Sequence, residues 1–333
     1  MNGFASVKAR VAEPFFTEAP MALSKVERLA EACGLPGRVI SSATGVVTLH
    51  AAEHFMVKLD RYVGEPLFLL NTLRDNIGSD KDSVANIPLP HRSTGVEAMG
   101  AIADHISAVL YGANFLCQRS ADRIWLLRTA ATTEWTDHWP VQQYNLEVVL
   151  QAVCKVFGHP IRPVSVRLNR IIDQRLLPDE MQGIPIELSN ATMGLAFDLS
   201  DLLSRSGGMF LQPREYHLSG LEQPDDTSIW SIGACIAAFL GSTDNGRLSE
   251  KASRAFGMSE RSYRRRLREM GVSHNQLVAD ARLSIADSML RDPSYSITDI
   301  ALELGYAHPP AFTRFFSDRV GMTPLEYRRR KLN

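Results

Sequence analysis

The sequence contains little cysteine and no long apolar run. Four cysteines are scattered over its 333 residues and form no Cys-x-x-Cys pair: Cys33, Cys117, Cys154 and Cys235. This spacing argues against a disulfide scaffold and against a structural zinc site. The most apolar stretch, IWSIGACIAAFL, is too short to cross a bilayer, and the start of the chain lacks the apolar core of a secretory signal. We therefore expect a cytoplasmic protein with reduced thiols and no membrane contact.

The sequence also lacks a glycine-rich phosphate loop and a catalytic constellation around Cys117 or Cys154. We expect no catalytic residue, no metal and no cofactor. One short pattern keeps an enzyme as the alternative. His50, Glu53 and His54 match the H-x-x-E-H arrangement, in which two histidines on one helix face hold zinc and the glutamate acts as base. The alternative function is thus a metal-dependent hydrolase with an accessory DNA-binding domain.

An excess of charge of one sign is absent from the chain as a whole, because 36 Lys and Arg and 37 Asp and Glu give a net charge of −1. The two ends differ, however. Residues 246–333 contain 16 Lys and Arg and 10 Asp and Glu, a net charge of +6, so residues 1–245 carry −7. A basic end on an acidic body predicts contact with nucleic acid at that end.

The basic end contains one helical pattern twice. In the first copy, an early helix ends near Phe256, Gly257 makes a turn, and Ser259 is suited to cap the next helix because its hydroxyl can accept a backbone N–H. Tyr263 and Leu267 lie four residues apart and share one face of that helix. The other faces carry arginines: Arg261, Arg264, Arg265 and Arg268.

In the second copy, Gly305 makes the turn, and Pro309 and Pro310 suit the first turn of a helix, where a missing N–H costs little. Between the copies, apolar residues from Leu277 to Leu290 recur at helical spacing and predict one helix of about 18 residues, or about 27 Å. Two helix-turn-helix units joined in this way can present their second helices about one DNA turn apart, ~34 Å.

The run IALELGYAHPPAFTRFFSDRVGMTPLEYRR closely resembles the signature of the AraC/XylS family of bacterial transcription regulators, and GMSERSYRRRL resembles that family's first recognition helix. The resemblance implies a regulator whose two recognition helices enter successive major grooves of double-stranded promoter DNA, with RNA polymerase as a further partner if it activates. By position, the implied DNA contacts are Ser259, Arg261, Ser262, Arg264, Arg265 and Arg268 in the first unit, and Pro309, Pro310, Thr313 and Arg314 in the second. The chain departs from the family pattern at His308 and the two prolines. Since proline carries no donor, we expect the second unit to read few base edges.

The rest of the chain mixes helical and strand patterns and predicts an α+β domain. Two short apolar runs, 114–119 and 123–129, predict a β-hairpin, and residues 163–168, 184–188 and 193–197 predict further strands. This layout resembles one AraC-family branch with an arabinose-binding-like, effector-sensing domain, although the label does not imply arabinose as the ligand. The expected organisation is a flexible arm (1–20), an α+β sensing or dimerisation domain (21–206), a linker (207–226) and an all-α DNA-binding domain with two helix-turn-helix units (227–333).

Aromatic and basic residues near the predicted hairpin are candidates for a small-molecule effector site, since ligand pockets are mostly apolar with a few placed polar groups. Arginine would suit an anionic effector. The candidates are Phe115, Trp125, Arg128, Trp135 and Arg167. Each could equally be part of the core or surface, and the sequence gives neither the identity of the effector nor the oligomeric state, although a homodimer is possible.

Overall fold

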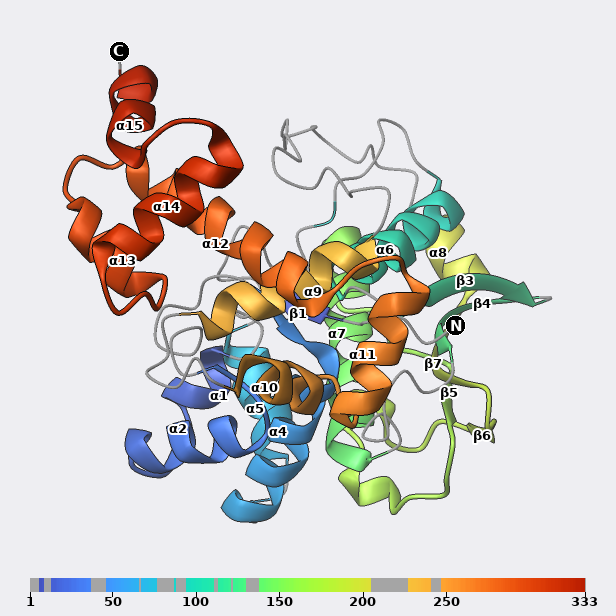
Figure 1. Cartoon of the computed structure of the whole chain (residues 1–333). Coiled ribbons are helices and arrows are strands. Elements are labelled where there is room, and N and C mark those ends of the chain that lie inside the picture. Colours follow the sequence, from blue (N-terminus) through green and yellow to red (C-terminus); the bar gives the residue numbers. More distant parts are fainter. Residues whose placement is uncertain are drawn as a thin grey trace.

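The computed structural model describes residues 6–8, 13–36, 46–65, 67–76, 87, 94–110, 113–120, 122–129, 138–204, 227–240 and 247–332. Figure 1 shows an N-terminal region of strands and helices followed by a C-terminal region of helices only. This confirms the expected fold class, α+β followed by all-α. The expected linker, 207–226, lies outside the described residues, as does Trp135.

A five-stranded sheet forms the centre of the N-terminal region. Its strand order is β3-β4-β7-β5-β6, and only β5 and β6 run parallel to one another. The hairpin predicted at 114–129 is confirmed as β3 and β4, which pair antiparallel with Phe115 opposite Arg128. The strands are β3 (Phe115–Ser120), β4 (Arg123–Thr129), β5 (Ser165–Leu168), β6 (Ile186–Leu188) and β7 (Thr192–Asp198).

Helices cover one face of this sheet and share a core with it. Leu126 of β4, Phe197 of β7 and Val166 of β5 are buried in the same cluster as Ile106 and Val149 of the covering helices. The helices of this region are α2 (Leu23–Ala32), α4 (Leu49–Val63), α5 (Phe68–Asn76), α6 (Gly95–Val109), α7 (Trp139–Phe157), α8 (Leu199–Ser204) and two short 3-10 turns, η2 (Gln174–Leu176) and η3 (Asp179–Met181).

The first twenty residues are not a loose arm where they are described. Residues Ser6–Lys8 form strand β1, which pairs antiparallel with β2 (Val46–Thr48), and Glu13–Thr17 form helix α1. Phe15 and Phe16 are buried, and Phe16 stacks on Phe55 of α4 with ring centroids 4.7 Å apart. The prolines nearby suggested irregular structure, and the expectation was wrong here because the burial of two adjacent aromatic side chains stabilises an ordered segment.

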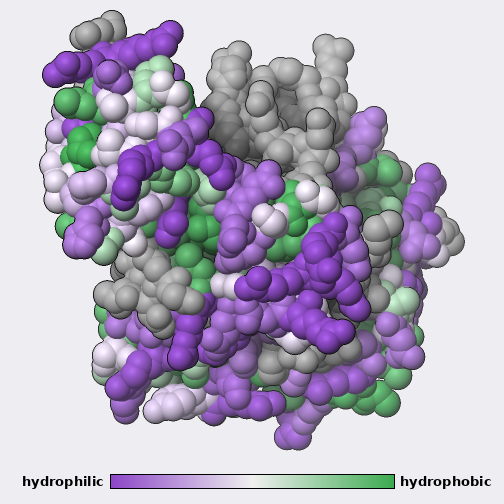
Figure 2. All heavy atoms as spheres, viewed as in Figure 1, coloured by the Kyte–Doolittle hydropathy of each residue, from purple (hydrophilic) through white to green (hydrophobic). Residues whose placement is uncertain are grey.

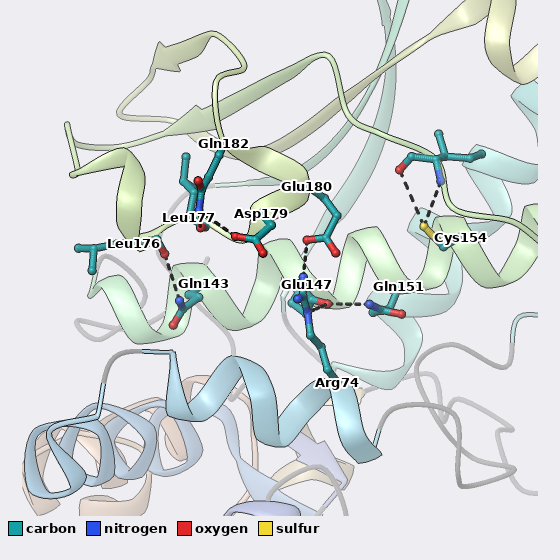
Figure 3. Close-up of polar contacts among 11 residues, drawn as sticks. Arg74, Gln143, Glu147, Gln151, Cys154, Leu176, Leu177, Asp179, Glu180 and Gln182 are labelled. Atoms are coloured by element: carbon teal, nitrogen blue, oxygen red, sulfur yellow. Dashed lines mark hydrogen bonds and ion pairs between the residues drawn. The ribbon is translucent and has the colours of Figure 1, made fainter.

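One ionic cluster around a buried carboxylate joins the helices to the loops beside the sheet (Figure 3). Arg74 of α5 donates from Nε to Glu147 of α7 over 2.7 Å and from Nη2 to Glu180 of η3 over 2.6 Å. Glu147 is fully buried and also accepts a hydrogen bond from Gln151 over 2.7 Å. A buried carboxylate with this many donors is compensated for the loss of water, so the cluster fixes how α5, α7 and η3 pack.

The C-terminal region contains two separate cores joined by one helix. Tyr263, Leu267 and Leu277 belong to the first core, and Leu290 and Phe312 belong to the second. Helix α12 enters both, and Figure 1 shows the second group of helices at its far end. The helices are α9 (Thr227–Phe239), α10 (Leu248–Ala255), α11 (Glu260–Glu269), α12 (His274–Leu290), α13 (Ile297–Glu303), α14 (Pro309–Val320) and α15 (Pro324–Leu332). At 17 residues, α12 agrees with the predicted connecting helix.

Among the residues that the structure describes, no helix has both the length and the apolar character needed to span a bilayer.

Candidate nucleic-acid interface

Helix α11 is built as an amphipathic helix with a basic outer face. Gly257 takes a positive φ of 64° in the turn before it, and the Ser259 hydroxyl accepts a hydrogen bond from the Ser262 backbone N–H, as the sequence predicted. Tyr263 and Leu267 are buried. Four arginines are exposed, and Figure 2 shows hydrophilic side chains gathered over this helix: Arg261, Arg264, Arg265 and Arg268.

Two of these arginines are paired with carboxylates of their own helix. Arg264 lies 3.0 Å from Glu260, and Arg265 lies 3.6 Å from Glu269, both at i,i+4 spacing. The sequence reasoning overlooked both glutamates, although the four-residue spacing was visible. Exposed pairs of this kind contribute little to stability, but they restrict where the guanidinium groups point.

Glu260, the first residue of α11, interacts with side chains of both α10 and α11. The Ser249 hydroxyl of α10 and the Arg264 guanidinium lower the pKa of its carboxyl. On the inner side of α11, the Tyr263 hydroxyl lies 3.1 Å from Nδ1 of His274, the first residue of α12. Burial, followed by the nearby Arg264, lowers the pKa of His274. The first turn of α11 therefore interacts with both the helix before it, α10, and the helix after it, α12.

The second unit has a different N-terminal turn. His308 precedes α14 without forming a side-chain cap, and Pro309 and Pro310 occupy the first helical positions. Phe312 and Phe316 are buried and hold the helix in the second core. On the outer side, Arg314 and Pro310 are exposed and Thr313 and Pro309 are half-buried. The candidate contacts of this unit thus include one exposed cation.

The basic tail is partly structural. Arg328 donates to the carbonyl oxygens of Leu290 and Tyr295, over 3.2 Å and 2.7 Å. The Tyr327 hydroxyl donates to Asp287 of α12 over 2.6 Å. These contacts lock α15 against the end of α12, so Arg328 fills a capping role.

The structure does not bring the predicted effector residues together. Phe115 belongs to the core between sheet and helices, and Arg128 pairs with Glu53 of α4 over 2.7 Å. Trp125 belongs to a separate small cluster, and its ring carries the Arg167 guanidinium 4.1 Å from its centre. Alternation along β4 puts residues 125 and 128 on opposite faces of the sheet. The two faces cannot line one pocket.

The same ion pair engages the glutamate on which the hydrolase alternative was based. His50 and His54 share one side of α4, with ring centroids 6.1 Å apart. Glu53 is buried, and its carboxylate accepts a hydrogen bond from Arg128 over 2.7 Å. Over the part of the chain that the structure describes, no three His, Cys, Asp or Glu side chains are arranged to hold a metal ion.

The first helix-turn-helix unit lies directly against the N-terminal region. The Thr48 hydroxyl caps α4 by accepting from the Ala51 N–H, and it donates to the Ala255 carbonyl oxygen. A Cβ on Gly257 would lie within 2.3–2.8 Å of the His50 ring atoms, so the turn passes tightly over that ring. Helix α9 lies beside β2. Nothing in the sequence indicated these contacts, because they join residues about two hundred positions apart.

Known proteins resemble this chain in the region of the two helix-turn-helix units. A family model described as a helix-turn-helix domain covers residues 252–330. An uncharacterized HTH-type transcriptional regulator of Mycobacterium tuberculosis is 36% identical over 73 residues, which are 22% of this chain and 21% of that protein. The DNA-binding dual transcriptional regulator Rns of Escherichia coli is 27% identical over 139 residues, 39% of this chain and 52% of that protein.

The chain thus spans between about a fifth and a half of the length of these curated relatives. The crystal structure of the transcriptional regulator CdpR from Pseudomonas aeruginosa covers 82% of this chain and 91% of its own, at 19% identity and a TM-score of 0.33. The two helix-turn-helix units joined by α12 agree with the family model and with the two curated relatives. In residues 252–330 the chain carries an AraC-type helix-turn-helix domain, and its relatives are transcriptional regulators of that family.

Proposed function

We propose that this protein is a sequence-specific transcription regulator that places α11 and α14 in two successive major grooves of promoter DNA. The observation that carries this proposal is the pair of helix-turn-helix cores joined by α12. A helix of 17 residues is about 26 Å long, and recognition helices held at its two ends can lie about one DNA turn apart, ~34 Å.

In this proposal the first unit supplies most of the base readout. Arg261 and Arg265 are exposed on α11, and guanidinium groups suit guanine edges because they offer paired donors. Arg268 and Arg264 supply phosphate contacts. In the second unit, Thr313 and Arg314 contribute phosphate or single-base contacts, since the two prolines at the start of α14 have no backbone donor.

The N-terminal region is proposed to control the first unit, through a small-molecule effector or through pairing of subunits in the cytoplasm. Its support is the contact of Thr48 and His50 with the turn between α10 and α11. A change in the N-terminal region is thereby transmitted to the start of α11 without crossing the second unit.

The test is selection of bound duplexes from a random pool with the full-length protein and an Arg261→Ala/Arg265→Ala variant. We expect the wild type to enrich two blocks about ten base pairs apart and the variant to lose one of them. An Arg162→Ala/Arg175→Ala variant removes the same charge from the N-terminal region and should retain both blocks. Enrichment of no sequence by the wild type, with binding governed only by salt, would reject sequence-specific readout.

A further inference from the structure

A cavity of about 390 Å³ lies between the N-terminal region and the first helix-turn-helix unit. One wall comes from α4 and the end of α2, and the other from α10, α11 and the turn between them. The polar lining consists mainly of Cys33, His50, His54, Glu250, Arg254 and Glu260. Neither region alone forms this cavity.

Its fixed charges favour a cation. Two carboxylates and one guanidinium face the space, and both carboxylate side chains are accessible, at 44% for Glu250 and 47% for Glu260. Burial raises the pKa of the Cys33 thiol to about 11, so this thiol is neutral at neutral pH. Ala32 and Met258 add apolar surface, and the two imidazoles add ring nitrogens that can form hydrogen bonds.

The shape and the donor spacing favour an organic cation over a bare metal ion. The volume is large enough for a small molecule, whereas no three of the described donor side chains are arranged around a single ion. An ammonium group with a short apolar chain would satisfy both the carboxylates and the apolar lining.

Each carboxylate of the cavity already holds an arginine. Glu250 lies 2.9 Å from Arg254, and Glu260 lies 3.0 Å from Arg264 of α11. An ammonium group that bound Glu260 would compete with Arg264 for the same oxygen atoms. Its binding would leave Arg264 available to DNA phosphate.

We propose that this cavity binds a small organic ammonium ion and that binding increases DNA affinity by releasing Arg264 from Glu260. The coupling part rests on the proposed DNA-binding function, whereas the binding part does not. Glu260 is the residue that connects the two parts.

The binding part is tested without DNA, by calorimetry on the full-length protein with n-butylammonium chloride as probe. We expect saturable binding that Glu260→Gln weakens by at least about tenfold, because the charge-assisted contact is lost. Glu269→Gln, on the same helix but outside the cavity, should bind like the wild type. Glu250→Gln gives a second variant of the lining, with weakened binding, should Glu260→Gln fail to fold by circular dichroism.

Sodium butyrate and zinc chloride distinguish the class of ligand. Binding of butyrate instead of butylammonium, or of zinc alone, would overturn an organic cation as the ligand. Failure of butylammonium to bind, or equal binding to wild type and both cavity variants, would overturn the site itself.

The coupling part is tested by DNA affinity over a range of salt concentrations. Butylammonium should raise the affinity of the wild type and of Glu269→Gln severalfold and leave Glu260→Gln unchanged. Both variants remove one negative charge near DNA, so their difference isolates the role of Glu260. If butylammonium binds but the wild-type DNA affinity stays constant, the coupling is rejected. If the protein binds no DNA at all, the proposed function fails while the binding result still stands.

Discussion

Arg128 and Glu53 are both almost completely buried, with side chains 2% and 3% exposed, and their charged groups lie 2.7 Å apart. The pair joins β4 of the sheet to α4, the helix that also carries His50 and His54. Such pairs add little net stability compared with an apolar pair, but breaking one partner leaves a buried charge without compensation.

Arg128→Met should therefore lower the free energy of unfolding by about 3–5 kcal/mol, because Glu53 would remain buried and charged. The double variant Glu53→Leu/Arg128→Met should recover most of this loss. Denaturant titration measures both. Arg167→Met, which removes a half-buried arginine from β5 of the same sheet, is the control and should cost much less. A loss in the double variant as large as in the single one would contradict this account.

Gly194 in β7 is required by the close approach of β4. A Cβ at this position would lie 1.9 Å from the Leu126 carbonyl oxygen, and neither backbone can move without breaking the ladder. Gly194→Ala should abolish folding or lower stability by more than about 3 kcal/mol. Gly100→Ala in α6 meets no atom within 4 Å and should stabilise by up to about 1 kcal/mol. Thermal unfolding of the two variants compares them directly.

For single residues, the sequence predicted roles that depend on partners a few positions away and missed roles that depend on partners far along the chain. Ser259 could be recognised as a cap because its partner is three residues away. Arg128 and Trp125 looked like binding residues because their types suit ligands, but their roles depend on Glu53 and Arg167, far away in the chain. Side-chain type alone did not reveal which face of the sheet each occupies.

Among the elements, α15 is held to α12 by a short polar link. The Tyr327 hydroxyl, and then Arg291, lower the pKa of the Asp287 carboxyl. The Tyr327 hydroxyl donates to this carboxylate over 2.6 Å. Since the folded state favours the charged form of Asp287, the link contributes stability above the ordinary Asp pKa of about 3.9 and loses it as pH falls through the lowered value.

Tyr327→Phe should reduce stability at neutral pH by about 1 kcal/mol, a value already discounted for the partial exposure of Asp287. The difference between variant and wild type should shrink as pH falls below the ordinary Asp pKa of about 3.9 and through the lowered pKa of Asp287. Urea titrations at several pH values provide the measurement, with Tyr295→Phe, at an exposed tyrosine, as the control. A difference that stays constant down to pH 2 would show that the ring contacts, not the carboxylate, hold α15.

Element positions followed the sequence closely wherever helical or strand periodicity was strong. The connecting helix α12 and the hairpin of β3 and β4 lie within a few residues of their expected bounds. Residues 1–20 were misjudged because β1 and α1 are short and depend on partners at Val46–Thr48 and Phe55. Short elements of this kind carry too few residues for a recognisable period.

In the whole molecule, the Thr48 hydroxyl supplies a direct hydrogen bond between the N-terminal region and the first unit. Thr48→Val should increase amide exchange in residues 248–260, because the bond to the Ala255 carbonyl is lost. Thr94→Val removes an equivalent cap from α6 and leaves the contact between the two regions intact. It therefore controls for the loss of about 1 kcal/mol of stability that accompanies the loss of a helix cap. Hydrogen exchange read by mass spectrometry compares the two. Equal exchange of residues 248–260 in both variants would contradict a role for Thr48 in holding the two regions together.

Helix α12 packs into both helix-turn-helix cores, so its length fixes the angle and the distance between the two units. One inserted residue would turn the second unit by about 100° and move it by 1.5 Å. Seven inserted residues nearly restore the angle but move the unit by about 10 Å, or three base pairs, while the DNA groove has turned by roughly a third of a revolution. No small insertion preserves both the angle and the distance. Under the proposed function, the length of α12 fixes the separation between the two half-sites, so new targets can arise by exchange of side chains on α11 and α14 but not by a gradual change in spacing.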